Sequence, residues 1–573
     1  MRFILASLLF SLTAFTAEPE FPLTEDSKPQ PNTPKGTLLK ETYTAKESSL
    51  FPGTQREYQI YLPAGFDKTK PAAFMVFQDG VIYQTPVVFD NLIAKKDIPP
   101  LVGIFIKPGV VPAANDKALP RFNRSYEYDS ITPTYSQFLL DEFLPAIEKK
   151  HGIQLSTDPN HAAISGNSSG GICAFMVAWH RPDRFRRVFT GVGTYVGIHG
   201  ADQLPVLVRK FEPKPLRVFL QSGTGDNNLY CGDWWMANQM MERSLTWAGY
   251  DVNHAWGEGG HNAKQASQIF PEVLRWLWRD WQTNIEIKVN AKGESKWKGY
   301  EVVGEGEWLS KAEIDYQFSM SAQNSGDVFI AGASGVTVLS PDGKTRYLQP
   351  VFENSRAQAI AAFSSDSLLA SRREGEDKWL LSKLEAGKWH DIAASTETSR
   401  FSVTHSGLMI LNNWRELTVV SPKGIVLNTQ ACKEGAAATT LSPDQSILYV
   451  ADQYDRYIHS YHLLPDGKLV NSEPYCRLEI KDGARDAECT GLCVDTNGWL
   501  YVATSLGIQV CDQAGRVNFI IPTPKQPLDV CFGGKDLSEL FIACGDAIYK
   551  RPTKAHGIVS GQMAPIKPPL PKL

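Results

Sequence analysis

Cysteine is sparse in this chain, and no two cysteines have the C-x-x-C spacing that is typical of thiol metal and redox sites. Nine cysteines occur in 573 residues, seven of them from Cys432 onward. Cys489 and Cys493 are spaced so that both fall on one face of a strand, and no histidine pair follows them. The distribution excludes a disulfide scaffold and indicates small buried hydrophobic side chains, so we expect no metal site from the cysteines.

Sustained positive charge is missing as well. The formal net charge is -4, and lysine and arginine form no long run. Nucleic acids and anionic membrane surfaces are bound by concentrated positive charge, so we exclude both as partners. The composition favours a small or neutral substrate and leaves the oligomeric state open.

Apolar residues are concentrated at the N-terminus, from Phe3 to Phe15, between Met1-Arg2 and Thr16-Ala17. A stretch this short does not cross a bilayer, but a basic start and a small-residue exit are typical of a secretory signal peptide. We expect residues 1–17 to be a signal peptide and the protein to be exported, to the periplasm or beyond. The polar, proline-rich residues 18–35 predict a linker with nothing to pack against.

The chain is too long for one hydrophobic core, and its pattern changes after residue 284. Before that point, apolar runs alternate with helical patterns. The runs are Ala72–Phe77, Val102–Ile106, His161–Ser165, Leu216–Leu220 and Val252–Trp256. Continuous apolar strands separated by helices predict a parallel sheet covered on both faces, an α/β domain over residues 36–284. Residues 285–298 are polar and unpatterned and predict a second linker.

The stretch Gly166-Asn167-Ser168-Ser169-Gly170 stands between a predicted buried strand and a helical pattern over residues 170–180. A Gly-x-Ser-x-Gly spacing lets strand, turn and helix approach closely while the serine hydroxyl projects beyond the end of the sheet. We therefore predict Ser168 to be a nucleophile on a strained turn.

The residues that follow the later strands complete a catalytic set. In a parallel sheet, active groups gather beyond the carboxyl ends of the strands. Asp226 follows the run 216–220, and His261 follows the glycine-rich turn after the last strand. Serine, aspartate and histidine thus occur in the order of α/β hydrolases, with histidine as the base and the carboxylate orienting its imidazole. Asp233 follows the same strand as Asp226 and is the alternative acid.

Acyl transfer also needs N–H donors for the oxyanion of the tetrahedral intermediate. The backbone N–H of Ser169, at the start of the predicted helix, is the first candidate. The second is expected in the loop after the run 72–77, from Asp79 or Gly80. A plain turn is the alternative for this Asp-Gly pair.

Residues 35–281 resemble the putative esterase family, which includes enterochelin-esterase-like proteins and the feruloyl and acetyl-xylan esterases of carbohydrate esterase family one. The matching stretches are FMVFQDG, NRSYEYD, AISGNSSGGICAFMVAWHRPDRF, FLQSGTGDN and EGGHN. The resemblance implies an α/β-hydrolase fold with Ser168 as nucleophile, Asp226 as acid and His261 as base.

The resemblance further implies that Arg124 lies near the site, either as a substrate contact or as half of an internal ion pair with Glu127. Beyond the acid, Tyr230, Trp234 and Trp235 form an aromatic cluster larger than a minimal esterase loop requires. Aromatic faces suit a sugar or a phenolic acyl group, and they suit equally well the packing of the helix that runs to Gly249.

After residue 298 the helical patterns vanish and a repeat of about 40 residues appears. Its strand-core positions are Phe329, Leu369, Met409, Tyr449, Tyr501 and Phe541. Six repeats of short strands predict a six-bladed β-propeller over residues 299–573.

The stretches LSPDQSILYVAD and CVDTNGWLYVATSLGIQVCDQAGR resemble the gluconolactonase and luciferin-regenerating-enzyme family, whose propellers hold a divalent cation at the axis. The family's metal ligands correspond here to Phe318 or Gln317, to Ala437 and to Thr490, and a hard cation needs several oxygen ligands. We expect a propeller that has lost its metal and its lactonase chemistry and serves binding. The blade-end residues proposed for binding are Asn412, Asn413, Trp414, Asp452, Gln453 and Tyr454.

Together these patterns predict an exported serine carboxylic-ester hydrolase that works without a cofactor through an acyl-Ser168 intermediate. The expected substrate is an acetyl or feruloyl ester, a small molecule or polysaccharide, of carbohydrate or plant origin. Two alternatives stand beside it: a lactonase that uses the propeller, and a non-catalytic protein in which both domains bind ligands. The lactonase lacks the metal ligands it would need, and the binding protein does not explain the intact set of Ser168, Asp226 and His261.

Overall fold

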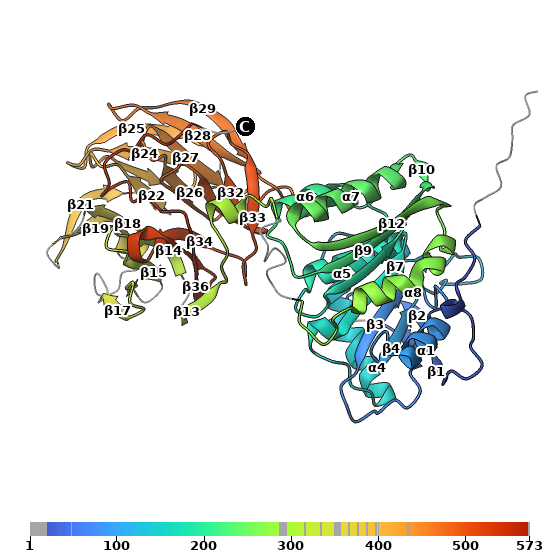
Figure 1. Cartoon of the computed structure of the whole chain (residues 1–573). Coiled ribbons are helices and arrows are strands. Elements are labelled where there is room, and N and C mark those ends of the chain that lie inside the picture. The colour runs from blue at the N-terminus through green and yellow to red at the C-terminus, as the bar shows by residue number, and fades with distance from the viewer. Residues whose placement is uncertain are drawn as a thin grey trace, which may run out of the picture. The chain divides into compact units, whose positions relative to one another are not determined.

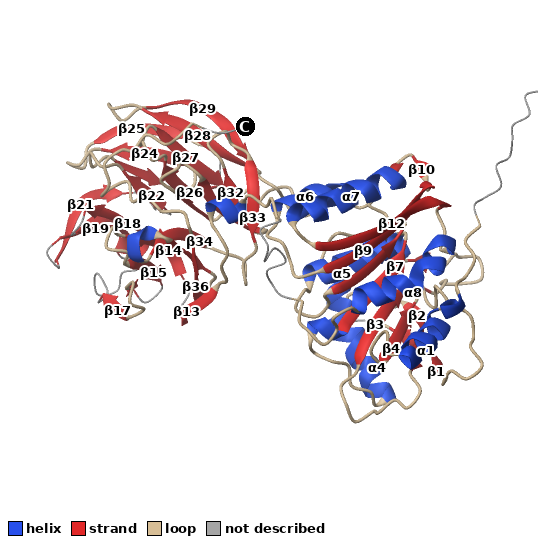
Figure 2. Cartoon of the chain, viewed as in Figure 1, coloured by secondary structure: helices blue, strands red, loops and turns tan. Residues whose placement is uncertain are grey.

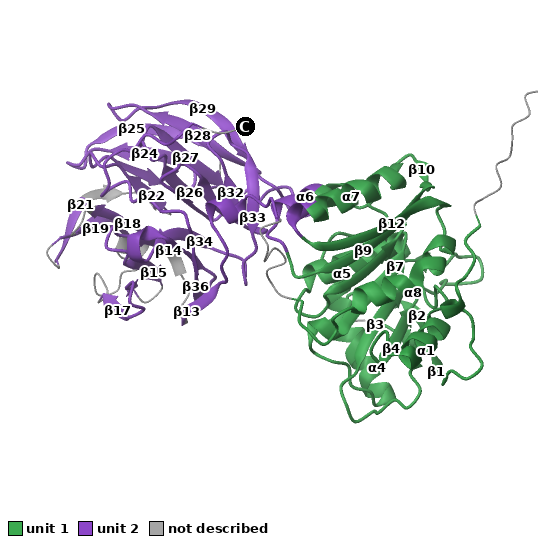
Figure 3. Cartoon of the chain, viewed as in Figure 1, with its two compact units in different colours: residues 1–205, 214–246, 250–293 green, residues 206–213, 247–249, 294–573 purple. Residues whose placement is uncertain are grey.

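The computed structural model describes two compact units (Figures 1 and 3). The described residues are 20–46, 49–285, 295–313, 317–332, 335–348, 357–364, 367–374, 378–385, 388–395, 398, 400–432 and 435–570. The first unit comprises residues 1–205, 214–246 and 250–293, and the second comprises residues 206–213, 247–249 and 294–573. The predicted signal peptide and residues 286–294 of the predicted second linker lie outside the described residues. In the described part, no helix has the length and apolar character to cross a membrane.

The first unit is organised around a ten-stranded sheet (Figure 2). Its strand order is β12-β9-β8-β7-β3-β4-β2-β5-β6, with β1 paired to β2. The bounds are β1 Thr37–Thr44, β2 Gln55–Leu62, β3 Ala73–Gln78, β4 Leu101–Ile106, β5 Val110–Val111, β6 Arg121–Phe122, β7 Ala162–Asn167, β8 Arg187–Gly191, β9 Arg217–Gly225 and β12 Asp251–Gly260. The strands from β12 to β4 are parallel, whereas β1 and β2 pair antiparallel. The predicted parallel sheet is confirmed.

Helices cover the sheet and bury its apolar residues. The α-helices, the π-helical turn and the two-stranded hairpin between residues 85 and 278 are α1 Thr85–Lys95, α2 Arg124–Tyr128, α3 Thr134–Gln137, the π-helical turn Phe138–Phe143, α4 Leu144–His151, α5 Ser169–His180, α6 Leu204–Lys210, β10 Asn228–Leu229 with β11 Gly232–Asp233, α7 Trp234–Ala248 and α8 Lys264–Trp278. Phe89 of α1 and Phe270 of α8 pack with Phe77 of β3 in one core cluster. The buried helix α5, which is not part of that cluster, packs against β3, β7 and β8.

Strand β8 is absent from the apolar runs that the sequence shows. It has the sequence RVFTG and begins with an arginine, although all five of its residues are buried. Arg187 donates from Nε to the carbonyl oxygen of Asn160 at 2.9 Å, and its guanidinium lies 5.1 Å from the ring centre of Trp278. With these partners Arg187 can be buried in the sheet, but its charged side chain interrupts the apolar run by which the other strands are predicted.

The segment predicted as a free N-terminal linker is held against α1 and α8 at Asp26 and Lys28. Buried Asn91 of α1 donates its amide to the carbonyl oxygens of Asp26 and Lys28 at 2.8 and 2.9 Å. The Asp26 carboxylate also pairs with Arg275 of α8 at 2.6 Å. Polar side chains on the helices therefore fix a segment whose own composition contains little to pack.

The second unit is a six-bladed propeller of four-stranded antiparallel sheets in the described part of the chain. The blades are β14 Gln317–Ala322 to β17 Thr345–Leu348, β18 Ala357–Ser364 to β21 Lys388–Ser395, β22 Arg400–Val403 to β25 Val426–Ala431, β26 Ala436–Leu441 to β29 Leu469–Arg477, β30 Gly491–Val494 to β33 Val517–Ile521, and β34 Asp529–Gly533 with β35 Glu539–Ala543, β36 Ala547–Pro552 and β13 Leu309–Glu313. A short helix, α9 Gly299–Val302, precedes β13. Each of the six repeated sequence positions lies on the second strand of its blade, so the predicted propeller is confirmed.

The last blade combines both ends of the propeller sequence. Strand β13 pairs antiparallel with β36, and Leu309 stands opposite Lys550.

The cysteines are free thiols, most of them buried, as expected from their distribution.

Candidate active site

Ser168 stands on a sharp turn between β7 and α5. Its backbone angles are φ 57° and ψ -123°, a conformation that a residue with a side chain rarely adopts and that is therefore strained. A Cβ atom at Gly166 would lie 2.2 Å from the carbonyl oxygen of Gly170, and one at Gly170 would lie 2.9 Å from Asp79 Oδ2. The close approach of strand and helix thus requires both glycines of the Gly-x-Ser-x-Gly stretch.

The structure brings Ser168, His261 and Asp226 into one chain of hydrogen bonds. The distance from Ser168 Oγ to His261 Nε2 is 2.8 Å, and His261 Nδ1 lies 2.6 Å from Asp226 Oδ1. The Asp226 side chain is fully buried, and its carboxylate also accepts from Ser222 Oγ at 2.6 Å and from the Asn227 N–H at 2.8 Å. These bonds fix the carboxylate, which in turn fixes the imidazole with Nε2 toward the serine.

Asp233, the alternative acid, has a different position. Its Oδ1 accepts the backbone N–H of Met236 at 3.0 Å, at the start of α7. A carboxylate in the first turn satisfies an N–H that has no partner within the helix. The structure therefore places Asp226, and not Asp233, against His261.

The two predicted oxyanion donors differ in their present bonding. Ser169 is the first residue of α5, where backbone N–H groups have no acceptor within the helix. The N–H of Gly80 donates to the carbonyl oxygen of Ile106 at 3.2 Å. Gly80 stays a prediction as the second donor, and that role requires this bond to be shared or given up.

Arg124 lies beside the nucleophile turn and is held by internal partners. Its Nε and one terminal nitrogen donate to the two oxygens of Asp79 at 2.7 and 2.9 Å, and the other donates to Ser169 Oγ at 2.9 Å. The guanidinium therefore connects the loop after β3 to the start of α5. The pairing of Arg124 with Glu127, one of the two alternatives for Arg124, does not occur, and substrate contact by Arg124 stays a prediction.

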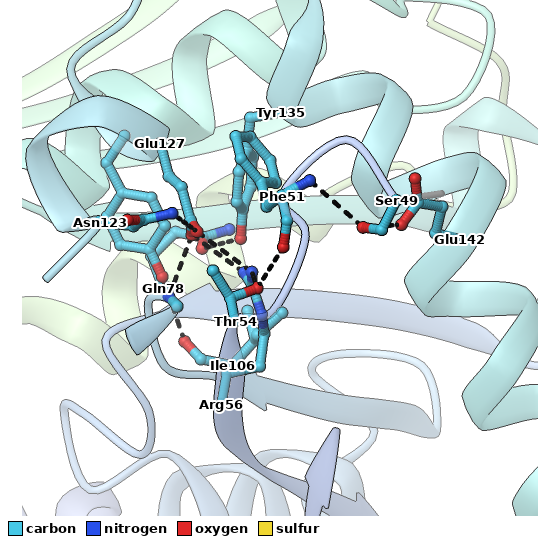
Figure 4. A network of polar contacts seen from close by, with 12 residues as sticks. Ser49, Phe51, Thr54, Arg56, Gln78, Ile106, Asn123, Glu127, Tyr135 and Glu142 are labelled. Carbon is cyan, nitrogen blue, oxygen red and sulfur yellow. Dashed lines mark hydrogen bonds and ion pairs between the residues drawn. The ribbon is translucent and has the colours of Figure 1, made fainter. Parts of the chain in front are cut away.

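Glu127 instead pairs with Arg56 of β2, and both side chains are fully buried (Figure 4). The two terminal nitrogens of Arg56 donate to the two carboxylate oxygens at 2.9 and 3.1 Å. Glu127 also accepts the N–H of Gly109 at 3.1 Å, and Arg56 also donates to Thr54 Oγ1 at 2.8 Å. This bidentate pair fixes α2, the short helix that begins at Arg124.

Comparison with known proteins divides the chain in the same way. Residues 49–259 match the family model "Putative esterase", and residues 404–545 match the model "SMP-30/Gluconolactonase/LRE-like region". After the models they match, we call the first region the esterase region and the second the gluconolactonase-like propeller. Both resemblances read from the sequence motifs are confirmed.

Individual relatives each match only part of the chain. Regucalcin of Sus scrofa is 32% identical over 108 residues, which are 18% of this chain and 35% of regucalcin. Iron(III) enterobactin esterase of Dickeya dadantii (strain 3937) is 29% identical over 152 residues, 24% of this chain and 33% of that protein. A solved ferulic acid esterase is 19% identical and matches 43% of this chain and 99% of its own, with a TM-score of 0.34. The chain spans about a third of the length of these curated relatives.

The aromatic cluster of the esterase region separates into three different environments. Tyr230, between β10 and β11, is 95% exposed. Trp234 is buried, its ring meets His261 edge-to-face at 5.5 Å, and its indole N–H donates to Thr194 Oγ1 at 3.2 Å. Trp235 packs edge-to-face on Trp256 at 5.4 Å. Tyr230 presents its ring to solvent, whereas Trp234 lies against His261.

Thr194 is a site residue that sequence reasoning missed. Its N–H donates to the carbonyl oxygen of Ser168 at 3.2 Å, and its Oγ1 lies 3.3 Å from Ser168 Oγ. The residue follows β8, and the residues after each strand are those to inspect in a parallel sheet. Because β8 is not an apolar run, the sequence does not predict this strand, and Thr194 is not identified as a residue that follows a strand.

The internal partners of Arg124 lead to a prediction for Arg124→Lys. A lysine cannot hold Asp79 and Ser169 at once, so the loop after β3 should lose its fixed position at the nucleophile. We expect kcat on a small aryl acetate to fall by about 10- to 100-fold with little change in KM. Steady-state kinetics test this, with Arg121→Lys in the exposed strand β6 as the matched control. A raised KM at unchanged kcat would instead assign Arg124 to substrate contact.

The inner strands of the propeller enclose a cavity of about 120 Å³. Asp529 supplies the one carboxylate among its described lining residues, and Arg400 Nε lies 3.6 Å from Asp529 Oδ2. Burial raises the pKa of Asp529, and its oxygens accept the N–H groups of Met320 and Val530. A guanidinium beside a single carboxylate is a poor donor set for a hard divalent cation, which takes six to eight oxygens.

The positions aligned with the family's metal ligands add little to this set. Ala437 has no side-chain oxygen, and Thr490 Oγ1 donates to the carbonyl oxygen of Pro527 at 2.9 Å. The side chains of Gln317 and Phe318 lie outside the described part. Among the side chains that are described, no group of three or more His, Cys, Asp or Glu could hold a metal ion. The side chains that the structure describes do not fit the family's cation.

Several of the blade-end residues proposed for ligand binding form hydrogen bonds within the propeller. Asn412 is buried and donates to the carbonyl oxygen of Ala436 at 3.0 Å, and Asp452 accepts the N–H of Tyr454 at 2.8 Å. The ring of Tyr454 is exposed. A ligand at these positions stays a prediction.

Proposed function

We propose that the esterase region is a serine carboxylic-ester hydrolase that works through an acyl-Ser168 intermediate. The observation that carries this proposal is the continuous hydrogen-bonded chain from Ser168 through His261 to buried Asp226. Serine at its free pKa is a weak nucleophile, and an adjacent imidazole that accepts its proton makes attack on an ester carbonyl feasible.

The chemistry then follows from the positions of these groups. Ser168 Oγ bonds to the acyl carbon while its proton passes to His261 Nε2, and Asp226 stabilises the resulting imidazolium. The carbonyl oxygen becomes an oxyanion, and the Ser169 N–H donates a hydrogen bond to it. When the intermediate collapses, the alcohol leaves with the proton from His261. Water repeats the sequence on the acyl-enzyme and releases the acid.

We further propose that the protein is exported and that its substrate is an acetyl or feruloyl ester of carbohydrate or plant material. The N-terminal sequence supports export, and the resemblance to the esterase family supports this class of substrate. So does the exposed ring of Tyr230 on the hairpin between the acid and α7, because an open aromatic face suits a sugar or a phenolic ring.

A panel of esters tests the proposed function on the full chain. Acetylated xylan, feruloylated arabinoxylan and a catecholate siderophore ester should be compared at equal enzyme concentration. We expect turnover of one of the two polysaccharide esters. Turnover of the siderophore ester alone would refute the carbohydrate class, and no hydrolysis of these or of an aryl acetate would refute the esterase.

For the gluconolactonase-like propeller we propose a metal-free binding or positioning role. Titration of Ca²⁺ or Zn²⁺ into the full chain should give neither stoichiometric binding at micromolar concentration nor a rise in melting temperature, because a bound ion would stabilise the folded state. Treatment with EDTA should leave ester hydrolysis unchanged. Stoichiometric metal binding, or lactonase activity that survives Ser168→Ala and disappears with EDTA, would favour the propeller as the enzyme.

A further inference from the structure

The proton positions around Ser168 follow from counting donors and acceptors. A tryptophan N–H only donates, so the Thr194 oxygen must accept the bond from Trp234 Nε1 at 3.2 Å. A carboxylate only accepts, so His261 Nδ1 carries a proton toward Asp226, and in the neutral imidazole that the serine mechanism requires Nε2 is the acceptor for the Ser168 proton. The threonine hydroxyl has one proton left to place.

That remaining proton faces the nucleophile. Among the contacts of the described side chains, Thr194 Oγ1 lies 3.3 Å from Ser168 Oγ, and the Ser168 proton is already directed at His261. The hydroxyls therefore form a sequence with one direction, from the Trp234 indole to Thr194, to Ser168, to His261. Thr194 is 1% exposed and Trp234 4% exposed, so water does not compete for the bond between these two side chains.

We propose that Thr194 is a further catalytic group of this site, which donates its hydroxyl proton to Ser168 Oγ and is itself held by Trp234. The proposal rests on the proposed serine-hydrolase function. Donation to one lone pair of Oγ leaves the serine proton a single direction, toward Nε2, and orients the other lone pair for attack on the acyl carbon. The same bond stabilises negative charge on Oγ while its proton moves to the imidazole, and Thr194 keeps its own proton throughout.

Thr194→Val tests the proposal because valine keeps the shape of threonine and removes the hydroxyl. The rate at which a fluorophosphonate labels Ser168 reports the reactivity of the nucleophile without a substrate-binding group. We expect labelling and kcat on an aryl acetate to fall by about 10- to 100-fold with KM nearly unchanged. Thr194→Ser, which restores the hydroxyl, should recover most of the lost reactivity.

Thr190→Val is the matched control. Thr190 lies on β8, is fully buried, and its Oγ1 accepts from the Tyr195 hydroxyl at 3.1 Å instead of contacting the nucleophile. It should lose a comparable amount of thermal stability while its labelling rate stays within about twofold of the wild type.

The outcomes separate this proposal from the proposed function. Wild-type protein that is not labelled at Ser168 would overturn both. Labelled wild type with a Thr194→Val rate within about twofold of it would overturn the role of Thr194 alone. A Thr194→Ser rate as slow as that of Thr194→Val would overturn it too, because the methyl group and not the hydroxyl would then matter. Thr194→Ser keeps the test valid where Thr194→Val fails to fold.

Discussion

Ser168→Ala should lower kcat/KM on an aryl acetate by about 10⁴- to 10⁶-fold, because the acyl-enzyme cannot form without Oγ. Alanine removes one oxygen and keeps the backbone turn, so the loss should appear without a change in melting temperature. Steady-state hydrolysis of p-nitrophenyl acetate, followed by release of the phenolate, measures it. Residual activity above the rate in buffer would come from binding and the oxyanion donor alone.

A second serine–histidine contact in the same unit provides the control. Ser156 Oγ lies 3.1 Å from His161 Nδ1, just before β7 and therefore at the opposite end of the strand from Ser168. Ser156→Ala removes a similar bond at the end of the sheet where no catalytic group is expected. It should retain hydrolysis within about twofold. Equal loss in both variants would show that the effect is structural, and full activity of Ser168→Ala would end the serine mechanism.

Glu127→Gln should lower the free energy of unfolding of the first unit by about 3–5 kcal/mol. The substitution keeps the size of the side chain and removes the charge that neutralises the fully buried guanidinium of Arg56. A buried cation without its partner bears the full cost of desolvation, which an exposed pair does not.

Hydrogen exchange measured by mass spectrometry in urea reads the first unit separately from the propeller, which a single unfolding curve does not. The exposed pair of Arg181 and Asp183, at 2.8 Å, offers the control. Asp183→Asn should cost less than about 1 kcal/mol. A similar loss in the two variants would mean that the buried pair contributes no more than a surface contact.

The fold and the three catalytic candidates could be predicted because local patterns determine them. Apolar runs that alternate with helices define a parallel sheet, and its carboxyl ends define where Ser168, Asp226 and His261 must lie. The repeat of short strands defines the propeller in the same way. None of these inferences needs the partner of an individual side chain.

What sequence reasoning could not supply depends on such partners. Arg124 and Asp79 are far apart in the chain and meet only because α2 is fixed beside the loop after β3. Buried Arg187 at the start of β8 hides this strand, and with it Thr194, because a charged residue interrupts the apolar run by which the other strands are predicted. Trp234 belongs to an aromatic cluster in the sequence, and only its burial and its contacts with His261 and Thr194 distinguish it from exposed Tyr230.

The pairing of β13 with β36 sets the order in which the propeller can be completed. Leu309 and Lys550 come from the beginning and the end of the propeller sequence, so their contact joins residues that are very far apart in the chain. Contacts of this kind form late in folding because a long loop must close first. During synthesis the last blade lacks a strand partner until nearly the whole chain has left the ribosome, and until then the ring has two open strand edges. A chain shortened before β36 would leave β13 without its neighbour and keep those edges open for aggregation.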